Sequence, residues 1–295
     1  MMNGKNWTQL LILSLLWGGS FFFVEVALEE LPVLTIVWCR VALASLLLAL
    51  ACVMSGTLLP RRLAVWRALF VMGFLNNAVP FTLFALAQGE ISGSLAAILN
   101  ATTPLFTVIV AHFATSDERL GPAKVAGLAL GFCGVLVMMA GGGGAGAWFG
   151  PMLCLLAALS YGMAGVWGRR FRRMGVAPLA TAFGQVTASS VLLAPIWMMV
   201  DRPWAMDVPG LHVVLAVVGI ASLSTALAYL LYFRLLASAG ATNLSLVTFL
   251  IPVSATLFGT VFLGERLLPQ HIVGFGLISM GLIAIDGRLL RRRVT

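Results

Sequence analysis

The segment Glu118–Gly134, ERLGPAKVAGLALGFCG, returns as ERLLPQHIVGFGLISMG over Glu265–Gly281. The two segments align without a gap, and seven of their seventeen positions are identical. Upstream, each copy has a proline inside an apolar segment, Pro104 and Pro252, and the glycine-rich run 141–146 lies almost at the midpoint of the chain. Such an internal repeat indicates two related structural units in tandem.

The composition decides the environment of both units. Apolar residues make up 61% of the 295 residues and charged residues 9%, against about 45–50% and about 25% in soluble proteins. A soluble fold needs more charge to cover its surface, so a soluble enzyme is excluded. A membrane-spanning helix needs about 20 apolar residues. Ten such helices are expected, at 8–27, 33–54, 66–87, 92–113, 121–140, 150–168, 178–200, 211–236, 242–263 and 268–286.

The repeat and the helix count together predict the fold class. We expect an all-α polytopic membrane protein of ten transmembrane helices, with a first five-helix repeat at 1–140, a glycine-rich linker at 141–147 and a second repeat at 148–295. Because five is odd, the second repeat enters the membrane from the opposite side. Inverted repeats are typical of secondary transporters, whose substrate site lies near the midplane between the repeats. An ancient duplication in a channel or a membrane enzyme is the alternative.

The basic residues predict the orientation. With the N-terminus inside, 15 of the 18 Lys and Arg lie on the cytoplasmic side, and Arg40, Arg202 and Arg266 lie on the other. The positive-inside rule therefore places both termini in the cytoplasm. A net charge of +8 also raises the question of nucleic-acid binding. The basic residues occupy short clusters such as 169–173 and 291–293, so we expect contacts with anionic membrane lipids and none with nucleic acid.

The residues Trp17-Gly18, Arg40, Pro104 with Glu118-Arg119-Leu120, and Pro252 with Gly264-Glu265-Arg266 resemble the EamA family of the drug/metabolite transporter superfamily. The resemblance covers essentially the whole chain. It implies a ten-helix exporter of small metabolites in the bacterial inner membrane, with the YddG-like exporters of aromatic and neutral amino acids among the best-known members. One departure is the spacing from the proline to the glutamate, which is fourteen residues in the first half and thirteen in the second.

Uncharged polar and aromatic residues gather near the predicted midplanes of several helices. Polar groups are costly at that depth, so a shared depth favours a solvated cavity over isolated helix–helix hydrogen bonds. Packing remains the alternative for each residue taken alone. The predicted substrate-binding cavity is lined by Trp17, Phe21, Asn76, Asn77, Pro80, Asn100, Thr103, Tyr161, Gln185, Thr225, Tyr229, Tyr232 and Thr248.

Arg40 is the one basic residue well inside a predicted helix. It either contacts a substrate carboxylate, which a guanidinium binds in a bidentate manner, or forms an ion pair at the outer rim with Glu25 or Glu29. Near the midplanes there is no Asp, Glu or Lys. The sequence therefore disfavours a carboxylate relay for proton coupling and favours facilitated export, although it leaves the coupling open.

The cysteines and histidines do not indicate catalysis. The four cysteines lie inside apolar segments without CxxC spacing, and the three histidines lie in separate segments. No catalytic residue, metal site or cofactor is expected. The predicted function is therefore the export of amino acids, aromatic and other neutral ones, or of similar small metabolites, by a monomer that works by alternating access. An exporter of another metabolite or of a drug, and less readily a channel, are the alternatives.

Overall fold

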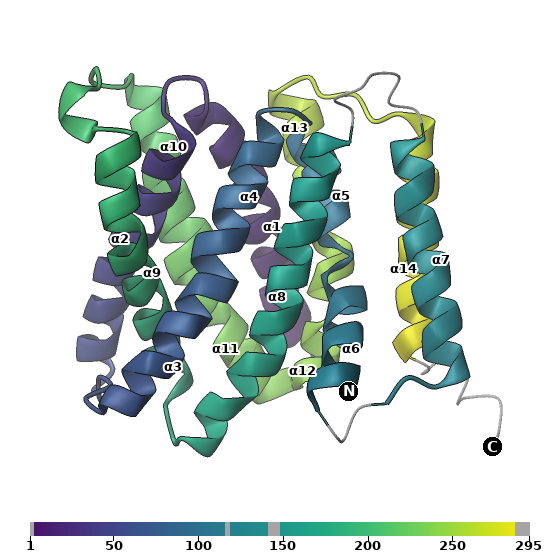
Figure 1. Ribbon diagram of the computed structural model, residues 1–295, viewed down its shortest axis with the longest axis horizontal. Helices are drawn as coiled ribbons and strands as arrows, with labels where there is room; N and C mark the ends of the chain where they lie inside the picture. The colour runs from purple at the N-terminus through teal and green to yellow at the C-terminus, as the bar shows by residue number, and fades with distance from the viewer. Residues whose placement is uncertain (1–2, 116–118, 141–147, 287–295) are drawn as a thin grey trace.

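Every apolar segment predicted to cross the membrane is helical in the computed structural model, which describes residues 3–115, 119–140 and 148–286 (Figure 1). Helices satisfy their own backbone N–H and C=O groups, as a hydrocarbon environment requires, and the described residues contain no strand. The predicted linker 141–147, Glu118 of the repeated motif, and the basic residues Arg288 and Arg291–Arg293 lie outside these ranges.

The first half consists of five helical rods, of which the third and the fourth are interrupted. In chain order they are α1 (Gly4–Ala27); α2 (Val33–Met54); α3 (Leu63–Gly73), π-helical η1 (Phe74–Ala78) and α4 (Val79–Gln88); α5 (Gly93–Asn100) and α6 (Thr103–Ala114); and α7 (Pro122–Met139).

The second half repeats this order. Its rods are α8 (Phe149–Arg173); α9 (Pro178–Val200), followed by the short 3-10 turn η2 (Pro203–Ala205); α10 (Leu211–Ala221), π-helical η3 (Ser222–Leu227) and α11 (Ala228–Ala239); α12 (Ala241–Leu244) and α13 (Val247–Phe262); and α14 (Pro269–Asp286). Eight rods are long and apolar enough to cross a membrane, and the segments Val247–Phe262 and Pro269–Ile285 are shorter apolar helices.

The two equivalent prolines act differently on their helices. In the first half, α5 ends at Asn100 and α6 begins at Thr103, so the break directly precedes Pro104. A proline lacks the backbone N–H and its ring crowds the preceding turn, which explains this break. Pro252 instead stays inside α13, and the break in the second half lies earlier, between α12 and α13. The sequence did not predict the interruptions.

Glycines hold α7 and α14 together. A Cβ atom at Gly127 would lie 2.6 Å from the carbonyl oxygen of Gly281, and one at Gly134 would lie 2.6 Å from that of Gly274. Only glycine allows the two backbones to approach this closely, as in other small-residue contacts between membrane helices. The two helices stand side by side at one edge of the bundle in Figure 1. The sequence repeat aligns Gly127 with Gly274 and Gly134 with Gly281, so each glycine packs against the counterpart of the other.

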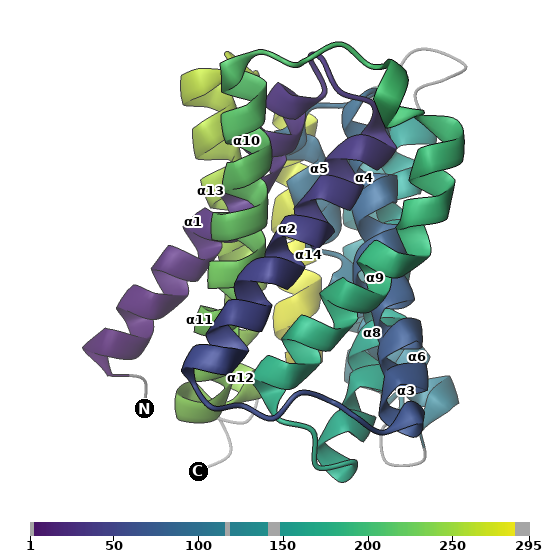
Figure 2. The ribbon, with the colours of Figure 1, turned by 90° about the vertical axis from the view of Figure 1, so that its left-hand side faces the viewer.

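The remaining rods form the main bundle. Helix α1 crosses it obliquely and packs on α13, α10 and α11, while α2 packs on α9 and α8 packs on α4 and α6 (Figure 2). The beginning of α1 and the end of α14 lie at the same end of the bundle (Figure 1). Both π-helical segments lie in the middle of their rods, and they hold the predicted cavity residues Asn76, Asn77 and Thr225.

Candidate functional site

Two π-helical segments, η1 and η3, interrupt the third rod of each half at equivalent places. A π-turn widens the helix, leaves backbone carbonyls without their usual donors and is frequent at functional sites. Pro80, at the start of α4, supplies no N–H for the carbonyl of Leu75 in η1, and the hydroxyl of Ser160 donates to that oxygen instead, at 2.7 Å. The carbonyl of Gly73, directly before η1, accepts from Ser189 Oγ at 2.9 Å. Helices α8 and α9 are thereby fixed against η1.

The side chains of η1 build a cluster of amides around one phenol. Asn76 Nδ2 donates to Gln185 Oε1 at 3.1 Å and to the Tyr229 hydroxyl at 3.2 Å, and Asn77 Nδ2 donates to the same hydroxyl at 3.0 Å. Asn77 and Gln185 are 0% and 2% exposed, whereas Asn76 and Tyr229 are partly exposed. Asn77 Oδ1 is buried and has no hydrogen-bond partner. The cluster therefore offers one free acceptor.

The side chains of η3 hold a buried guanidinium. Thr225 Oγ1 donates to the carbonyl of Ile220 at 2.8 Å, five residues back as in a π-turn, and accepts from Arg40 Nε at 3.0 Å. The Arg40 guanidinium lies 3.5 Å from the centre of the Phe81 ring and is only 8% exposed. The side chains of Tyr161 and Tyr229 lie near it. Arg40 therefore adjoins the amide cluster of η1.

The rim ion pair considered for Arg40 does not form among the described residues. Glu25 accepts a hydrogen bond from the backbone N–H of Gly93, and Glu29 bonds His212 at 3.1 Å. Arg40 keeps a positive charge in the interior without a carboxylate from the described part of the chain. Because a buried charge is stable only when it is paired or well hydrogen-bonded, this guanidinium is suited to receive an anionic group.

Pairs of aromatic rings form a further part of the site. Phe21 meets Phe84 edge-on with ring centres 5.7 Å apart, and Phe84 stacks on Tyr161 at 6.1 Å. Trp17 and Tyr232 pack on each other at 5.6 Å. Rings at such separations attract one another or an inserted aromatic group. Phe81 and Phe84 were not predicted, because nothing in their own helix shows that they face Arg40 or Tyr161.

The predicted cavity residues therefore divide into groups. Hydrogen bonds connect four of them, Asn76, Asn77, Gln185 and Tyr229. A further hydrogen bond connects Thr225 to Arg40, which lies next to this group. Pro80 and Tyr161 adjoin them. Other residues find local partners instead: Thr103 Oγ1 donates to Asn100 Oδ1 at 3.2 Å, and Thr248 Oγ1 donates to the carbonyl of Ser245 at 2.7 Å in an exposed position. These contacts do not connect them to the Tyr229 cluster.

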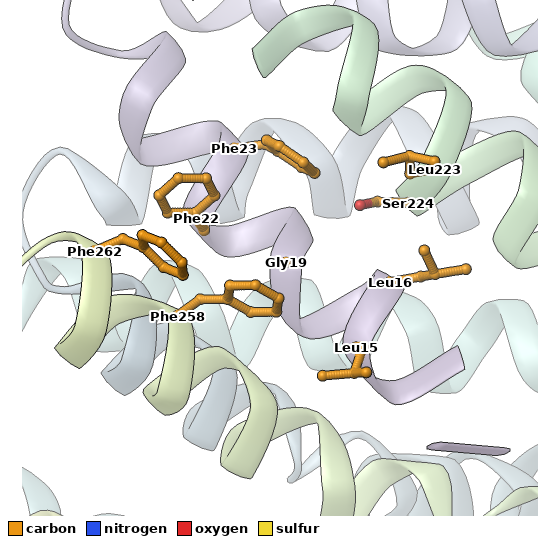
Figure 3. A pocket seen from close by; sticks show the side chains of 9 residues that line it. All are labelled: Leu15, Leu16, Gly19, Phe22, Phe23, Leu223, Ser224, Phe258 and Phe262. Atoms are coloured by element: carbon orange, nitrogen blue, oxygen red, sulfur yellow. The ribbon is translucent and has the colours of Figure 1, made fainter. Parts of the chain in front are cut away.

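A separate cavity of about 310 Å³ lies between α1, η3 and α13 (Figure 3). Leu15 and Phe262, which are 42% and 65% exposed, show that it opens on the outer surface of the bundle. Ser224 is its one polar side chain. None of the predicted cavity residues lines this groove, whose lining is Leu15, Leu16, Gly19, Phe22, Phe23, Leu223, Ser224, Phe258 and Phe262. It is an apolar surface feature distinct from the Tyr229 cluster.

Comparison with known proteins decides the family. The model of the EamA-like transporter family matches residues 7–140 and, a second time, residues 148–285. The chain belongs to this family. Among EamA-like relatives, the inner membrane transporter YedA of Escherichia coli K12 is 26% identical over 278 residues, which cover 94% of this chain and 89% of YedA. Protein PecM of Dickeya dadantii is 27% identical over 284 residues, which cover 94% of this chain and 91% of PecM.

The architecture also matches a solved one. A crystal structure at 20% sequence identity superposes with a TM-score of 0.69 and covers 99% of this chain and 100% of that chain. At this identity the match concerns the fold alone. The family and its relatives establish this EamA-like protein as a multi-pass inner-membrane transporter of small molecules.

Proposed function

We propose that this EamA-like transporter exports amino acids, aromatic and other neutral ones, across the bacterial inner membrane by alternating access. The observation that carries the proposal is the buried guanidinium of Arg40, which has Thr225 and Phe81 as its contacts and no carboxylate from the described residues. A substrate carboxylate supplies the missing anion, and a guanidinium binds it through two parallel hydrogen bonds.

The amide cluster suits the ammonium group of a zwitterion. Asn77 Oδ1 is a buried acceptor without a donor, and a substrate ammonium group has three N–H donors to offer. Tyr229 links the two binding groups, since its hydroxyl accepts from Asn77 and its side chain lies near Arg40. An amino acid carries its ammonium and its carboxylate on one carbon, so one small ligand offers a group to each. The rings of Tyr161, Phe84 and Phe21 suit an apolar or aromatic side chain.

The reciprocal glycine contacts of α7 and α14 support an inverted repeat. Gly127 packs on Gly281, and Gly134 packs on Gly274. Such an exchange is what a two-fold relation between two copies of one unit produces. In this proposal ten helices span the membrane, both termini lie in the cytoplasm, the protein acts as a monomer, and the two halves rock about the Arg40–Tyr229 site.

Transport by purified protein in liposomes tests the proposal. We expect labelled phenylalanine, threonine or methionine to enter proteoliposomes, and the unlabelled amino acids to compete. Trp17→Ala and Tyr229→Ala are expected to impair this uptake while the protein still accumulates in the membrane. Transport of none of these amino acids would refute the amino-acid assignment and favour another metabolite or a drug. Single-channel currents across a planar bilayer would count against alternating access.

A further inference from the structure

Two carboxyl groups from distant parts of the chain meet at the N-terminus of α5. Glu25 Oε2 accepts the N–H of Gly93 at 3.0 Å, and Glu265 Oε1 accepts the same N–H at 2.9 Å. Glu265 Oε2 also accepts the N–H of Ser94 at 3.1 Å. Because both carboxyl groups accept the same N–H, their oxygens are close neighbours. Two negative charges this close repel each other, so a single shared proton is favoured.

The surrounding residues leave space for the pair. A Cβ atom at Gly93 would lie 2.9 Å from Glu25 Oε2, and a Cβ atom at Gly259 would overlap Glu265 Oε2. Gln88 Nε2 would lie 3.2 Å from the same Cβ atom at Gly93, and it donates to the carbonyl of Phe21 at 2.8 Å. Helices α1, α4, α5 and α13 and the α13–α14 connection therefore all contribute to one carboxyl site. Its location is the end of the bundle away from the start of α1 (Figure 1).

A buried hydroxyl at the pair also lacks a partner. Ser94 is 1% exposed, and its Oγ makes no hydrogen bond. It lies beside Glu265 Oε2, since a Cβ atom at Gly259 would be 2.8 Å from Ser94 Oγ while overlapping that carboxyl oxygen. The hydroxyl is thus placed to donate to or accept from the carboxyl group as its protonation changes.

The donors around the pair favour a proton over a metal ion. Three hydrogen bonds from backbone N–H groups end on its carboxyl oxygens. These N–H groups belong to the first turn of α5, where the helix carries a partial positive charge. A metal cation would need the same oxygens and would face the same positive dipoles, whereas a proton needs only one oxygen of the pair. Like charges at such short range do not both ionise readily.

Few other charged groups surround the pair in the described residues. In the turn after α1, Glu29 and Glu30 are engaged by His212 and by the N–H of Gly210. Glu90, which follows α4, and Arg266, which follows Glu265, are exposed. The α14 histidine, His271, is buried with Nδ1 unpartnered. Helices α5 and α13 contribute no charged side chain.

We infer that Glu25 and Glu265 form a proton-binding site whose occupancy controls the opening of this end of the bundle. With the proton bound, the pair holds α1 and the α13–α14 connection together on the first turn of α5. Loss of the proton leaves two adjacent negative charges, which repel each other and separate these segments. The consequence for transport rests on the proposed function: export is linked to protonation at the face where the substrate leaves. The proton site itself does not depend on the identity of the substrate.

Infrared difference spectroscopy of the full-length protein in lipid nanodiscs tests the site without a substrate. During a pH titration, we expect the wild type to show the C=O stretching band of a protonated carboxylic acid, and this band to disappear as the shared proton leaves. Glu25→Gln retains a donor towards Glu265 and is expected to lose the titrating band. Glu265→Gln is the second variant, and Glu90→Gln, at an exposed carboxyl, is the control that keeps the band. A wild type without the band, or a band that persists in both variants, would overturn the site.

A transport measurement then tests the control of opening. We expect phenylalanine counterflow in wild-type proteoliposomes to change with the pH on the exit side, and the rate in Glu25→Gln to lose this dependence. A wild-type rate that is the same at every exit-side pH, with a titrating infrared band, would refute the control of opening. Absence of phenylalanine transport at all pH values would refute the amino-acid assignment, while the infrared titration would still decide whether the proton site exists.

Discussion

The π-helical segments η1 and η3 occupy the same place in the two halves, yet they carry different chemistry. They begin at Phe74 and Ser222, which are 148 residues apart, as Pro104 and Pro252 are. In η1 the side chains are amides that converge on a phenol, and one amide oxygen remains free. In η3 a hydroxyl holds a guanidinium.

This difference shows what the repeat preserves and what it does not. The widened backbone occurs in both halves because both have the same helical unit, whereas the side chains on the two π-turns have diverged. A symmetric pair of π-turns would offer the same group to both ends of a ligand. Here one turn offers an acceptor and the other holds a cation. Such a site suits a zwitterion, which carries a positive and a negative group.

The largest effect is expected on the η3 side. Arg40→Gln removes the charge while Thr225 keeps its own bond to Ile220. A hydrogen bond to a charged group contributes about 1.5–3 kcal/mol, so the Kd for an amino-acid substrate is expected to rise about 10-fold to 100-fold. Binding of labelled phenylalanine to purified protein measures it. Arg40→Lys should retain part of the affinity, and Arg202→Gln, at an exposed arginine, should leave it unchanged. Unchanged binding by Arg40→Gln would remove the guanidinium from the site.

The next effect concerns the phenol that joins the two sides. Tyr229→Phe deletes the acceptor shared by Asn76 and Asn77, so amide donors are left buried without this partner. An unsatisfied buried donor costs about 1–3 kcal/mol, and we expect a lower unfolding temperature by scanning fluorimetry together with weaker transport. Tyr232→Phe is the matched control, because its ring still packs on Trp17. Equal stability of both variants would contradict the central position assigned to Tyr229.

A smaller effect is expected from the backbone of η1. Ser160→Ala removes the hydroxyl that donates to the carbonyl of Leu75, and a hydrogen bond of this kind contributes about 1 kcal/mol. Chemical or thermal unfolding should show a modest loss of stability, with the Kd for substrate changed less than in Arg40→Gln. Ser160→Thr keeps the hydroxyl and serves as the control. A loss of binding as large as that of Arg40→Gln would mean that Ser160 contacts the substrate itself.

The smallest effect is expected on the η3 turn. Thr225→Ser preserves the hydroxyl, its bond to Ile220 and its contact with Arg40, so binding should stay close to wild type. Thr225→Val removes both hydrogen bonds at nearly constant volume and should weaken binding by a few-fold, since Arg40 loses one partner but keeps its charge. Titration calorimetry with phenylalanine distinguishes the two variants. Equal affinity in Thr225→Val and the wild type would show that η3 does not position Arg40.

The sequence predicted most of the helices and much less of their mutual contacts. Apolar segments specify which residues form the helices, and the repeated motif contains the glycines that pack in α7 and α14. The depth of a polar residue can also be estimated from its own segment, and Asn76, Gln185 and Tyr229 were predicted on that ground. Depth does not specify direction, however. Asn100 and Thr248 were predicted on the same ground but bond to local partners.

Contacts between distant segments account for what was missed. The sequence favoured a pairing of Arg40 with Glu25 or Glu29 because all three were expected near the same end of the bundle. In the structure, the N-terminus of α5 attracts Glu25, together with Glu265. The π-turns were missed as well, because the sequence showed the depth of Asn76, Asn77 and Thr225 but not the widening of the backbone that carries them.

The most direct measurement compares thermal stabilisation of the purified protein by phenylalanine with stabilisation by phenethylamine, which lacks the carboxylate, and by 3-phenylpropionate, which lacks the ammonium. If Arg40 and Asn77 bind the two ends of a zwitterion, phenylalanine raises the Tm of the wild type most, and each analogue raises it less. Arg40→Gln then removes the advantage of phenylalanine over phenethylamine. Equal stabilisation by phenylalanine and phenethylamine in the wild type, or an unchanged difference in Arg40→Gln, would contradict the account.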